Sequence, residues 1–571
     1  MNHSTPVVLK FASSVLRRRS DLPRAVSEVY RHVRDGRKVV AIVSALDDET
    51  ERLAADAAEI GAGLSSRHAA GFIALGEARA AYALAIACDH SGIAADVLEA
   101  KELRLSASGP FDDAWPTGVD PAGVMAALQH AEVVIAPGYV AVGPDGGLVL
   151  LGRGGADLTA IVLADALGAG EATFLTRVGG LFDRDPLTPE RMPAPDAKRF
   201  DSVTWAGARA LAGDPIQPKA LSYAERREVA LRLIAPAAND GTVIGPTGAP
   251  PRPAPTPAPV RIGVAGLGVV GEGAALRIIF EPSRYELAAT LVSDAGKPRH
   301  RQIDPSKITT DIGAFLDSRP EVIIDAMSSG AAGLELIEAA LARGISVATA
   351  NKQAICDDLP RLEALAKANN ARLGYSPSVG GGAPMLETAR RAAAIGGVGD
   401  IHAVLNGTVN FILSQVAAGA SFDAALAAAQ AAGFAEADPS ADLSGDDARA
   451  KGKILAYAAY GADPAAVTTD IEALDGPKAD GFAREGGVWR QVARISRRGD
   501  GAHVEVRYEK VDGDPFMMSL FGEQNALRVE TAGGLLVCRG RGAGRAPTVE
   551  AALADVGEII RERSLSSGAR P

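Results

Sequence analysis

The stretch from Gly433 to Tyr457 gathers residue types that can bind a charged amine and move a proton. Pro439 and Gly445 break regular structure, so a loop is expected, and a helical pattern follows from Asp446. Two lysines come directly after five carboxylates, which are Glu436, Asp438, Asp442, Asp446 and Asp447. Such a loop can hold a cationic amine while a lysine offers a proton donor.

Asp447 and Lys451 are four residues apart, so a helix places them on the same face. This spacing predicts that the carboxylate orients the lysine. The same sequence is also compatible with a solvated loop followed by an ordinary surface ion pair. These residues alone leave both interpretations open.

A second motif lies in the middle of the chain, where the apolar run Val260 to Val264 leads into Ala265-Gly266-Leu267-Gly268-Val269-Val270-Gly271. A strand, a GxGxxG turn and a helix start in this order are typical of a dinucleotide-binding Rossmann fold. Gly266 would make the tight turn, Gly268 would let the backbone approach a pyrophosphate, and Gly271 would let helix and strand pack. Val269 and Val270 complete the predicted cofactor turn.

The fingerprint predicts NAD or NADP as the cofactor, and the residues after the second expected strand, 286–292, are compatible with both. Asp294 would bind a ribose hydroxyl, which favours NAD. Lys297 and Arg299 would bind a 2′-phosphate, which favours NADP, although a solvated basic turn accounts for them equally well.

Two further strands are expected at 321–326 and 345–350, and they are followed by Asn351, a candidate cofactor-binding residue, and by Lys352. Open α/β sheets bind ligands at the carboxyl ends of their strands, so Lys352 is expected at the site rather than as a surface lysine.

The segments LNGTVNFIL (405–413), GFAEADPSADLSGDDARAK (433–451) and ANK (350–352) closely resemble homoserine dehydrogenase. The resemblance extends from about Val260 to about Ile560. It implies interconversion of L-homoserine and L-aspartate 4-semialdehyde with a nicotinamide cofactor, in threonine and methionine biosynthesis. Ser293 departs from the family, which often has an arginine there.

The resemblance also implies roles for single residues. Lys451 would donate a proton to the carbonyl oxygen and Lys352 would polarise it, with Asp447 orienting Lys451. Glu436 and Asp442 would hold the substrate ammonium, and Gly407 and Thr408 would lie near substrate and cofactor. In the closing segment 540–548, Gly544 would lie near the nicotinamide.

The loop 375–384 resembles the segment that binds a monovalent cation in this family through backbone carbonyls. Val379, Gly381 and Ala383 would supply these carbonyls. Ser376 replaces the family's glutamate, so only a loosely held monovalent cation is expected.

The first half of the chain alternates predicted strands with helices, which favours a largely parallel α/β sheet. The strands are expected at 6–11, 38–44, 94–98, 133–136, 149–151 and 171–176. This half resembles the kinase domain of aspartokinase, more weakly than the second half resembles its family. The residues that carry this likeness are Lys10, Ser44, Glu77, Arg153 and Asp157.

Three departures from the kinase pattern predict a folded domain without kinase activity. Ala12-Ser13 stands where the family has two glycines, so the phosphate-binding turn is obstructed. Arg177 replaces an acid near the nucleotide, and around 213–218 the family's lysine and histidine are absent. Two alternatives remain, a working bifunctional aspartokinase/homoserine dehydrogenase and a non-catalytic amino-acid or nucleotide sensor.

The expected fold is α/β throughout, with an α+β catalytic domain, and five segments are predicted. They are an aspartokinase-like domain (1–245), a Pro/Ala linker (246–259), a Rossmann domain (260–385), a catalytic domain (386–535), and a closing segment that returns to the Rossmann domain (536–571). Only the linker separates the two halves, so the regulatory domains usual in aspartokinases are not expected.

Composition limits the partners of this 571-residue chain. A net charge of -11 argues against nucleic acid, and three scattered cysteines predict neither a disulfide framework nor a zinc site. No signal peptide and no membrane-spanning run are expected, so a cytoplasmic protein is predicted. We expect small-molecule substrates and a homo-oligomer.

Overall fold

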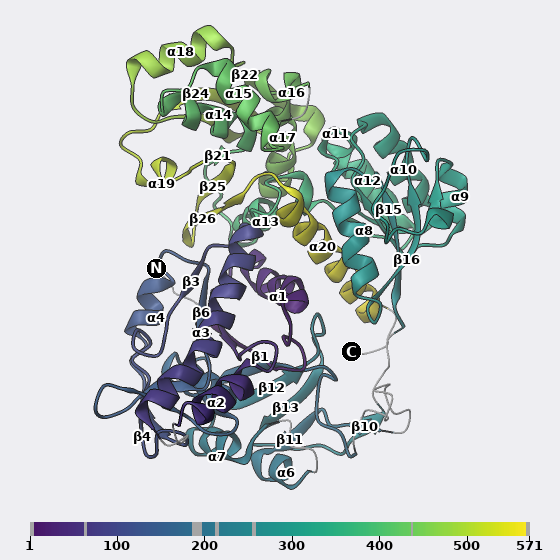
Figure 1. Cartoon of the computed structure of the whole chain (residues 1–571). Helices are drawn as coiled ribbons and strands as arrows, with labels where there is room; N and C mark the ends of the chain where they lie inside the picture. Colours follow the sequence, from purple (N-terminus) through teal and green to yellow (C-terminus); the bar gives the residue numbers. More distant parts are fainter. Residues whose placement is uncertain are drawn as a thin grey trace. The chain divides into compact units, whose positions relative to one another are not determined.

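The computed structural model describes residues 5–61, 66–184, 197–211, 216–253, 258–435 and 438–566. The chain divides into two compact units, the first ending at Thr256 and the second beginning at Pro257. This division falls within the segment 246–259 that composition predicts as a linker. Each unit is described below by itself (Figure 1).

The first unit contains an eight-stranded sheet in the order β11-β13-β12-β9-β1-β2-β6-β3. All neighbours are parallel except β12 and β13, which confirms the expected α/β class. β1, β2 and β6 are buried along their whole length, which is why they read as unbroken apolar runs. The strands are β1 (Val7–Phe11), β2 (Val39–Val43), β3 (Ala95–Val97), β6 (Val133–Pro137), β9 (Glu171–Leu175), β11 (Ser202–Thr204), β12 (Ala230–Ile234) and β13 (Gly241–Gly245).

A second, four-stranded sheet in this unit has the order β5-β4-β7-β8. The segment expected as a strand near 149–151 belongs here as β8 (Leu148–Leu150), antiparallel to β7 (Val140–Val142). The strand expected here is confirmed, but it belongs to a short antiparallel hairpin and lies outside the largely parallel sheet. The other two strands are β4 (Ser106–Ser108) and β5 (Trp115–Gly118).

The helices of the first unit include one apolar enough to pass, by length and composition, a test for a membrane span. This is α3 (Arg67–His90), and half of its apolar stretch is buried inside the unit. It packs against β6 and β8, as a core helix does. The others are α1 (Leu22–Arg34), α2 (Glu49–Glu59), α4 (Ala122–Ala127), α5 (Gly155–Ala166), α6 (Trp205–Ala210) and α7 (Pro218–Arg227).

The segment expected as a plain extended linker begins as part of the first unit. Its residues β14 (Arg252–Pro253) pair antiparallel with β10 (Lys198–Arg199). Arg252 Nε also lies 2.6 Å from a carboxylate oxygen of Asp201. An extended, proline-rich backbone has the conformation that strand pairing requires, so composition alone did not distinguish the two.

The second unit begins with a six-stranded, entirely parallel sheet in the order β17-β16-β15-β18-β19-β20. Counted along the chain this is the order 3-2-1-4-5-6 of doubly wound dinucleotide-binding domains. Its strands are β15 (Val260–Ala265), β16 (Tyr285–Leu291), β17 (Ile308–Thr309), β18 (Val322–Asp325), β19 (Ser346–Thr349) and β20 (Leu373–Gly374); its helices are α8 (Val269–Phe280), α9 (Ile312–Asp317), α10 (Gly330–Ala342), α11 (Lys352–Ile355) and α12 (Leu359–Ala368).

The second sheet of this unit has the order β22-β24-β23-β21-β25-β26 and is mostly antiparallel. Its strands are β21 (Ile401–Val404), β22 (Val467–Ile471), β23 (Trp489–Arg498), β24 (Gly501–Lys510), β25 (Gln524–Thr531) and β26 (Gly534–Arg541). The helices are α13 (Met385–Ile395), α14 (Gly407–Ala417), α15 (Phe422–Ala431), α16 (Ser440–Leu443), α17 (Asp446–Tyr460), α18 (Gly476–Glu485) and α19 (Pro515–Met518).

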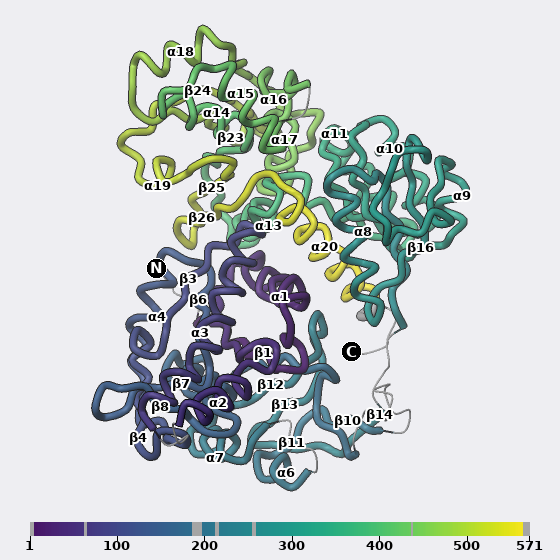
Figure 2. Tube along the Cα trace, viewed as in Figure 1, coloured from purple at the N-terminus to yellow at the C-terminus, as the bar shows by residue number. Residues whose placement is uncertain are grey.

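The chain then returns to the first of these sheets through α20 (Arg545–Ser566), which lies alongside α8 in Figures 1 and 2. Val549, Ala552 and Val556 of α20 share a buried core with residues of β15 and β18. The boundary expected at 535/536 falls inside β26, because that strand still pairs with β25. The return begins at Arg545.

Candidate active site

The predicted loop and helix around Asp447 form one end of α17. Gly445, with a φ of +84°, precedes the helix, a conformation that favours glycine. Asp446 and Asp447 occupy the first turn, where carboxylates suit the positive end of the helix. Both Asp447 and Lys451 are buried, so the face they share is the interior one rather than a solvated surface.

The carboxylate of Asp447 lies between two lysines from different parts of the unit. Its Oδ2 is 2.8 Å from Lys451 Nζ on the same helix. Its Oδ1 is 3.0 Å from Lys352 Nζ, at the start of α11. Lys352, which follows β19 of the parallel sheet, and Lys451, on α17, are thus held together by one carboxylate.

The two ammonium groups explain the ionisation of Asp447. Burial alone would raise the pKa of this carboxyl, but Lys451 and Lys352 outweigh burial and lower the pKa to about 2. Asp447 is therefore a carboxylate across the physiological range.

Asn406 joins a second carboxylate to this cluster. Its Nδ2 donates to Asp442 Oδ1 at 2.8 Å and to Asp447 Oδ2 at 3.1 Å, while its Oδ1 caps α14 by accepting from Val409 N. Burial, and then the charge of Asp447, raise the pKa of Asp442 above its ordinary value. The predicted ammonium-binding carboxylate thus lies beside the lysine cluster.

The carbonyl oxygen of Leu405 fixes the position of Lys451. It accepts from Lys451 Nζ at 2.8 Å and from Asn525 Nδ2 at 3.1 Å. Asn525 is fully buried, and its own Oδ1 has no hydrogen-bond partner among the described residues. Sequence reasoning missed Asn525, since nothing near it in the chain indicates that it meets Leu405.

Two of the three remaining predicted substrate residues, Gly407 and Thr408, lie in the described part of the chain. Gly407 and Thr408 begin α14, directly after Asn406, and the Thr408 hydroxyl donates to the carbonyl of Phe434 at 2.7 Å. A Cβ on Gly407 would lie 2.6 Å from the carbonyl oxygen of Glu523, so only glycine fits. Glu436 lies outside the described residues.

Two of the three glycines of the GxGxxG turn are required by the packing of the protein itself. A Cβ on Gly266 would lie 2.6 Å from the Ala326 carbonyl oxygen, and one on Gly271 would lie 1.7 Å from that of Gly266. A Cβ on Gly268 would meet nothing within 4 Å. The protein itself does not require glycine at 268, and the open, exposed backbone there fits the close approach of a pyrophosphate.

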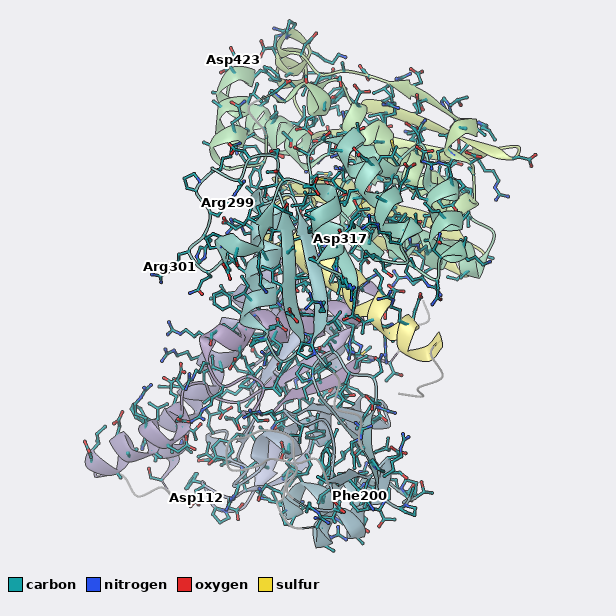
Figure 3. All side chains as sticks on the ribbon, turned by 90° about the vertical axis from the view of Figure 1, so that its right-hand side faces the viewer. Asp112, Phe200, Arg299, Arg301, Asp317 and Asp423 are labelled. Atoms are coloured by element: carbon teal, nitrogen blue, oxygen red, sulfur yellow. The ribbon has the colours of Figure 1, made fainter. Side chains whose placement is uncertain are left out.

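The residues predicted to read the adenosine end lie on the loop after β16, and Figure 3 labels one of them, Arg299. Asp294 and Lys297 are exposed, and Asp294 Oδ1 accepts from Gly296 N at 2.8 Å. Arg299 donates to the carbonyl oxygen of Leu267 at 2.9 Å and to that of Asp294 at 3.3 Å. The loop is thus tied to the GxGxxG turn.

Asn351 and Gly544 lie directly before helices, Asn351 before α11 and Gly544 before α20. The Asn351 side chain accepts from Ala354 N and donates to Ser329 O, which caps α11 and so directs Lys352. Gly544 has a φ of +115° directly before α20, and the Thr548 hydroxyl donates to its carbonyl. Both therefore shape the backbone close to the dinucleotide-binding sheet.

The loop predicted to bind a cation is buried, including Val379, Gly381 and Ala383. The Ala383 carbonyl accepts from Met385 N at 2.7 Å, and Gly381 has a φ of +58°. The amide of Ser376, where the glutamate is absent, donates to Asp555 of α20 at 2.9 Å. No cluster of side chains suited to a metal ion occurs within the ranges that the structure describes.

In the first unit, three of the predicted kinase residues form a buried group. Lys10 Nζ lies 2.7 Å from Asp157 Oδ1, with side chains 10% and 9% exposed. Glu77 accepts from the Thr50 hydroxyl, and burial raises its pKa to about 7. Ser44 is half-buried and Arg153 is exposed.

Two amides of the turn after β1 form hydrogen bonds within the turn itself. The Ala12 carbonyl accepts from both Val15 N and Leu16 N, at 2.8 and 3.0 Å. Ser14 Oγ accepts from Arg177 N at 3.4 Å, so the replaced residue lies next to this turn. Of the region around 213–218, only Ile216, Gln217 and Pro218 are described.

Comparisons with known proteins follow this division of the chain. The family model for homoserine dehydrogenase matches residues 384–556, and that for the homoserine dehydrogenase NAD-binding domain matches 266–376. A homoserine dehydrogenase from Neisseria gonorrhoeae is 32% identical over 317 residues, 53% of this chain and 73% of that protein.

The chain belongs to the homoserine dehydrogenase family. It is an NAD(P)-dependent oxidoreductase whose second unit carries both domains of this family. The expectation drawn from the motifs at 350–352, 405–413 and 433–451 is confirmed.

Two other similar proteins and a third family model complete the comparison. An NAD(+)-dependent homoserine dehydrogenase from Pseudomonas canavaninivorans is 36% identical over 227 residues, 38% of this chain and 63% of that protein. The crystal structure of a homoserine dehydrogenase from Thiobacillus denitrificans is 26% identical, with a TM-score of 0.48, and covers 55% of this chain and 76% of that one. The model of the amino acid kinase family matches residues 5–234, so a kinase-like domain fused to a homoserine dehydrogenase is confirmed.

Proposed function

We propose that the homoserine dehydrogenase reaction takes place at the cluster of Lys352, Asp447 and Lys451. The observation that supports this is the sharing of one carboxylate by two lysines, one following β19 and one on α17. The carboxyl ends of the parallel strands are where a dinucleotide binds, so the cluster lies where a substrate can meet it.

Within this proposal each side chain has one task. Lys451 donates a proton to the carbonyl oxygen of aspartate 4-semialdehyde, and Lys352 polarises the same oxygen. Asp447 holds both ammonium groups in place. Asp442, together with Glu436, binds the ammonium group of the substrate. The bound dinucleotide supplies or accepts the hydride.

We propose NAD rather than NADP as the preferred cofactor. Asp294 is exposed after β16, where a carboxylate suits ribose hydroxyls and repels a 2′-phosphate. Arg299, on the same loop, already donates to the carbonyl oxygens of Leu267 and Asp294. A similar protein is described as NAD(+)-dependent. Comparing kcat/KM for NADH and NADPH tests the preference, and a higher value for NADPH would reverse it.

We propose that the carbonyls of Val379, Gly381 and Ala383 bind a monovalent cation only loosely. The Ala383 carbonyl already accepts a backbone hydrogen bond, and Ser376 brings no negative charge. Exchanging sodium, potassium and a large organic cation at constant ionic strength should therefore change kcat by less than about threefold. We also expect a homo-oligomer, which light scattering on the purified protein would measure.

We propose that the first unit does not transfer phosphate to aspartate. Phosphoryl transfer depends on positioning and on charge stabilisation around the phosphates. Here the amides of Val15 and Leu16, in the turn after β1, donate to the Ala12 carbonyl. Lys10 forms an ion pair with Asp157. The first unit then has a structural role and no kinase activity.

Two assays on the purified protein separate the functions. Semialdehyde-dependent oxidation of NADH should be fast, while ADP release that depends on both ATP and aspartate should be absent. Robust formation of aspartyl phosphate would favour a bifunctional enzyme instead. Absence of both activities, with ligand binding retained, would favour a sensor.

A further inference from the structure

Two arginines donate hydrogen bonds to the carbonyl oxygens on either side of Gly268. Arg299 Nη1 donates to Leu267 O at 2.9 Å. Arg545 Nε donates to Val269 O, also at 2.9 Å. Gly268, which lies between these two carbonyls, is the exposed glycine whose Cβ would meet nothing.

These hydrogen bonds fix two peptide planes. The Leu267 carbonyl belongs to the same peptide as the amide of Gly268, and the Val269 carbonyl to the same peptide as the amide of Val270. No peptide in the described residues is cis, so each amide points away from its carbonyl. Arginines bound to the carbonyls therefore hold the amides of Gly268 and Val270 turned the opposite way.

Arg545 is held in this position by contacts of its own. Its Nη2 lies 3.2 Å from Glu272 Oε1, in the first turn of α8. A Cβ on Gly273 would lie 2.8 Å from Arg545 Cγ, so the arginine stem passes across this glycine. The side chain comes from the first residue of α20, and its contacts join α20 to the start of α8.

Arg299 approaches the turn from the loop after β16. It also donates to Asp294 O, and its Nε is buried without a hydrogen-bond partner among the described residues. Figure 3 shows it on the same loop as Arg301. Arg299 and Arg545 thus reach neighbouring carbonyls of one turn from two segments far apart in sequence.

We propose that Arg299 and Arg545 are positioning residues that preset the amides of Gly268 and Val270 for the cofactor pyrophosphate. The proposal rests on the dinucleotide being bound at this turn, as the proposed function requires. A turn whose peptides are already oriented loses less conformational freedom when the phosphates bind. Neither arginine needs to touch the reacting atoms.

Calorimetry with fragments of the cofactor tests this without turnover. ADP-ribose contains the pyrophosphate, whereas AMP contains the adenosine end without it. We expect Arg545→Ala to weaken ADP-ribose binding about 10- to 100-fold, the range for a lost charged hydrogen bond, and AMP binding less than threefold. Arg299→Ala should weaken ADP-ribose binding as well, but because Arg299 also donates to Asp294 O on the adenosine-side loop, Arg545→Ala is the variant that tests the selectivity over AMP.

A conservative variant and a matched control complete the design. Arg545→Lys keeps the positive charge beside Glu272 but lacks the planar fork, so its ADP-ribose affinity should lie between those of the natural protein and the alanine variant. Arg563 also docks α20, donating to Glu321 O at 3.0 Å and Gly344 O at 3.1 Å. Arg563→Ala should leave both affinities unchanged.

Steady-state kinetics give the second readout. In Arg545→Ala the KM for NADH should rise by about the same factor as the affinity for ADP-ribose falls. The kcat and the KM for semialdehyde should stay within about threefold of those of the natural protein. Unchanged ADP-ribose affinity, or equal losses for ADP-ribose and AMP, would overturn the proposal. If the natural protein itself bound no ADP-ribose, the dinucleotide assignment would fail with it.

Discussion

Lys451 and Asp447 stand one turn apart on α17, with Nζ and Oδ2 separated by 2.8 Å and side chains 11% and 6% exposed. An i,i+4 pair on a helix surface contributes a few tenths of a kcal/mol. This pair is buried and has a second lysine on the other carboxylate oxygen, which supports the proposed active site and distinguishes the pair from one that only stabilises a helix.

Lys451→Ala should remove most turnover and leave cofactor binding intact. The amine acts on the substrate oxygen, so kcat should fall about 10²- to 10⁴-fold, as for a general acid. Lys453 is the matched control, because it lies two residues away and pairs with Asp357 at 2.7 Å. Near-normal kcat in Lys451→Ala, or an equal loss in Lys453→Ala, would remove the assignment.

Asp447→Asn should both destabilise the second unit and lower kcat. It leaves two ammonium groups without their carboxylate, and because Lys352 is partly exposed the cost should be about 3 kcal/mol, the lower end of the range for a broken buried pair. The lowered pKa of Asp447 contributes stability that is present above the ordinary pKa of 3.8 and is lost as pH falls toward about 2. Asp446→Asn changes the neighbouring exposed carboxylate, which pairs with Arg449, and denaturant unfolding at pH 7 should separate the two variants.

Asp442→Asn should raise the KM for homoserine about 10- to 100-fold, with a smaller effect on kcat. The pKa of Asp442 is raised, so its carboxylate is protonated at a higher pH than an ordinary aspartate. In the natural protein the KM should therefore rise as pH falls into the acid range, whereas the variant's KM should be high and flat. An unchanged KM at pH 8 would show that Asp442 does not face the ammonium.

Glu77→Gln should stabilise the first unit at alkaline pH. The folded form keeps its proton up to about pH 7, whereas the unfolded form loses it near 4.5, so stability falls as pH rises between these values. The difference corresponds to about 3 kcal/mol at pH 8, which glutamine would recover. Fluorescence of Trp115 and Trp205, in a Trp489→Phe background, would follow this unit. A variant that is less stable than the natural protein at pH 8 would contradict this.

The sequence predicted the parts of the site that depend on local pattern. The GxGxxG turn, the strand before Asn351 and the helix from Asp446 were expected at their observed places, since turn glycines and apolar periodicity are local signals. Asp447 and Lys451 were expected to meet because four residues separate them on one helix.

Contacts between distant segments could not be predicted in the same way. Asn525 meets Leu405 across 120 residues, and Arg545 meets Val269 across 276. The pairing of Lys352 with Asp447 was not predicted, because the resemblance placed only the two lysines at one substrate oxygen. The short strand β14 was missed because a proline-rich extended segment and a strand share one backbone conformation.

The return of α20 to the first sheet of the second unit makes the dinucleotide-binding domain discontinuous in sequence. Its core needs Val549, Ala552 and Val556, which the ribosome adds long after β15 and β18. Until α20 is synthesised, β15, β18 and α8 lack part of the apolar surface against which they pack. The second sheet, β21 to β26, can fold before α20 packs against the first sheet. Catalytic competence of the nucleotide site should therefore appear late in synthesis, and a chain stopped before Arg545 should bind chaperones rather than cofactor.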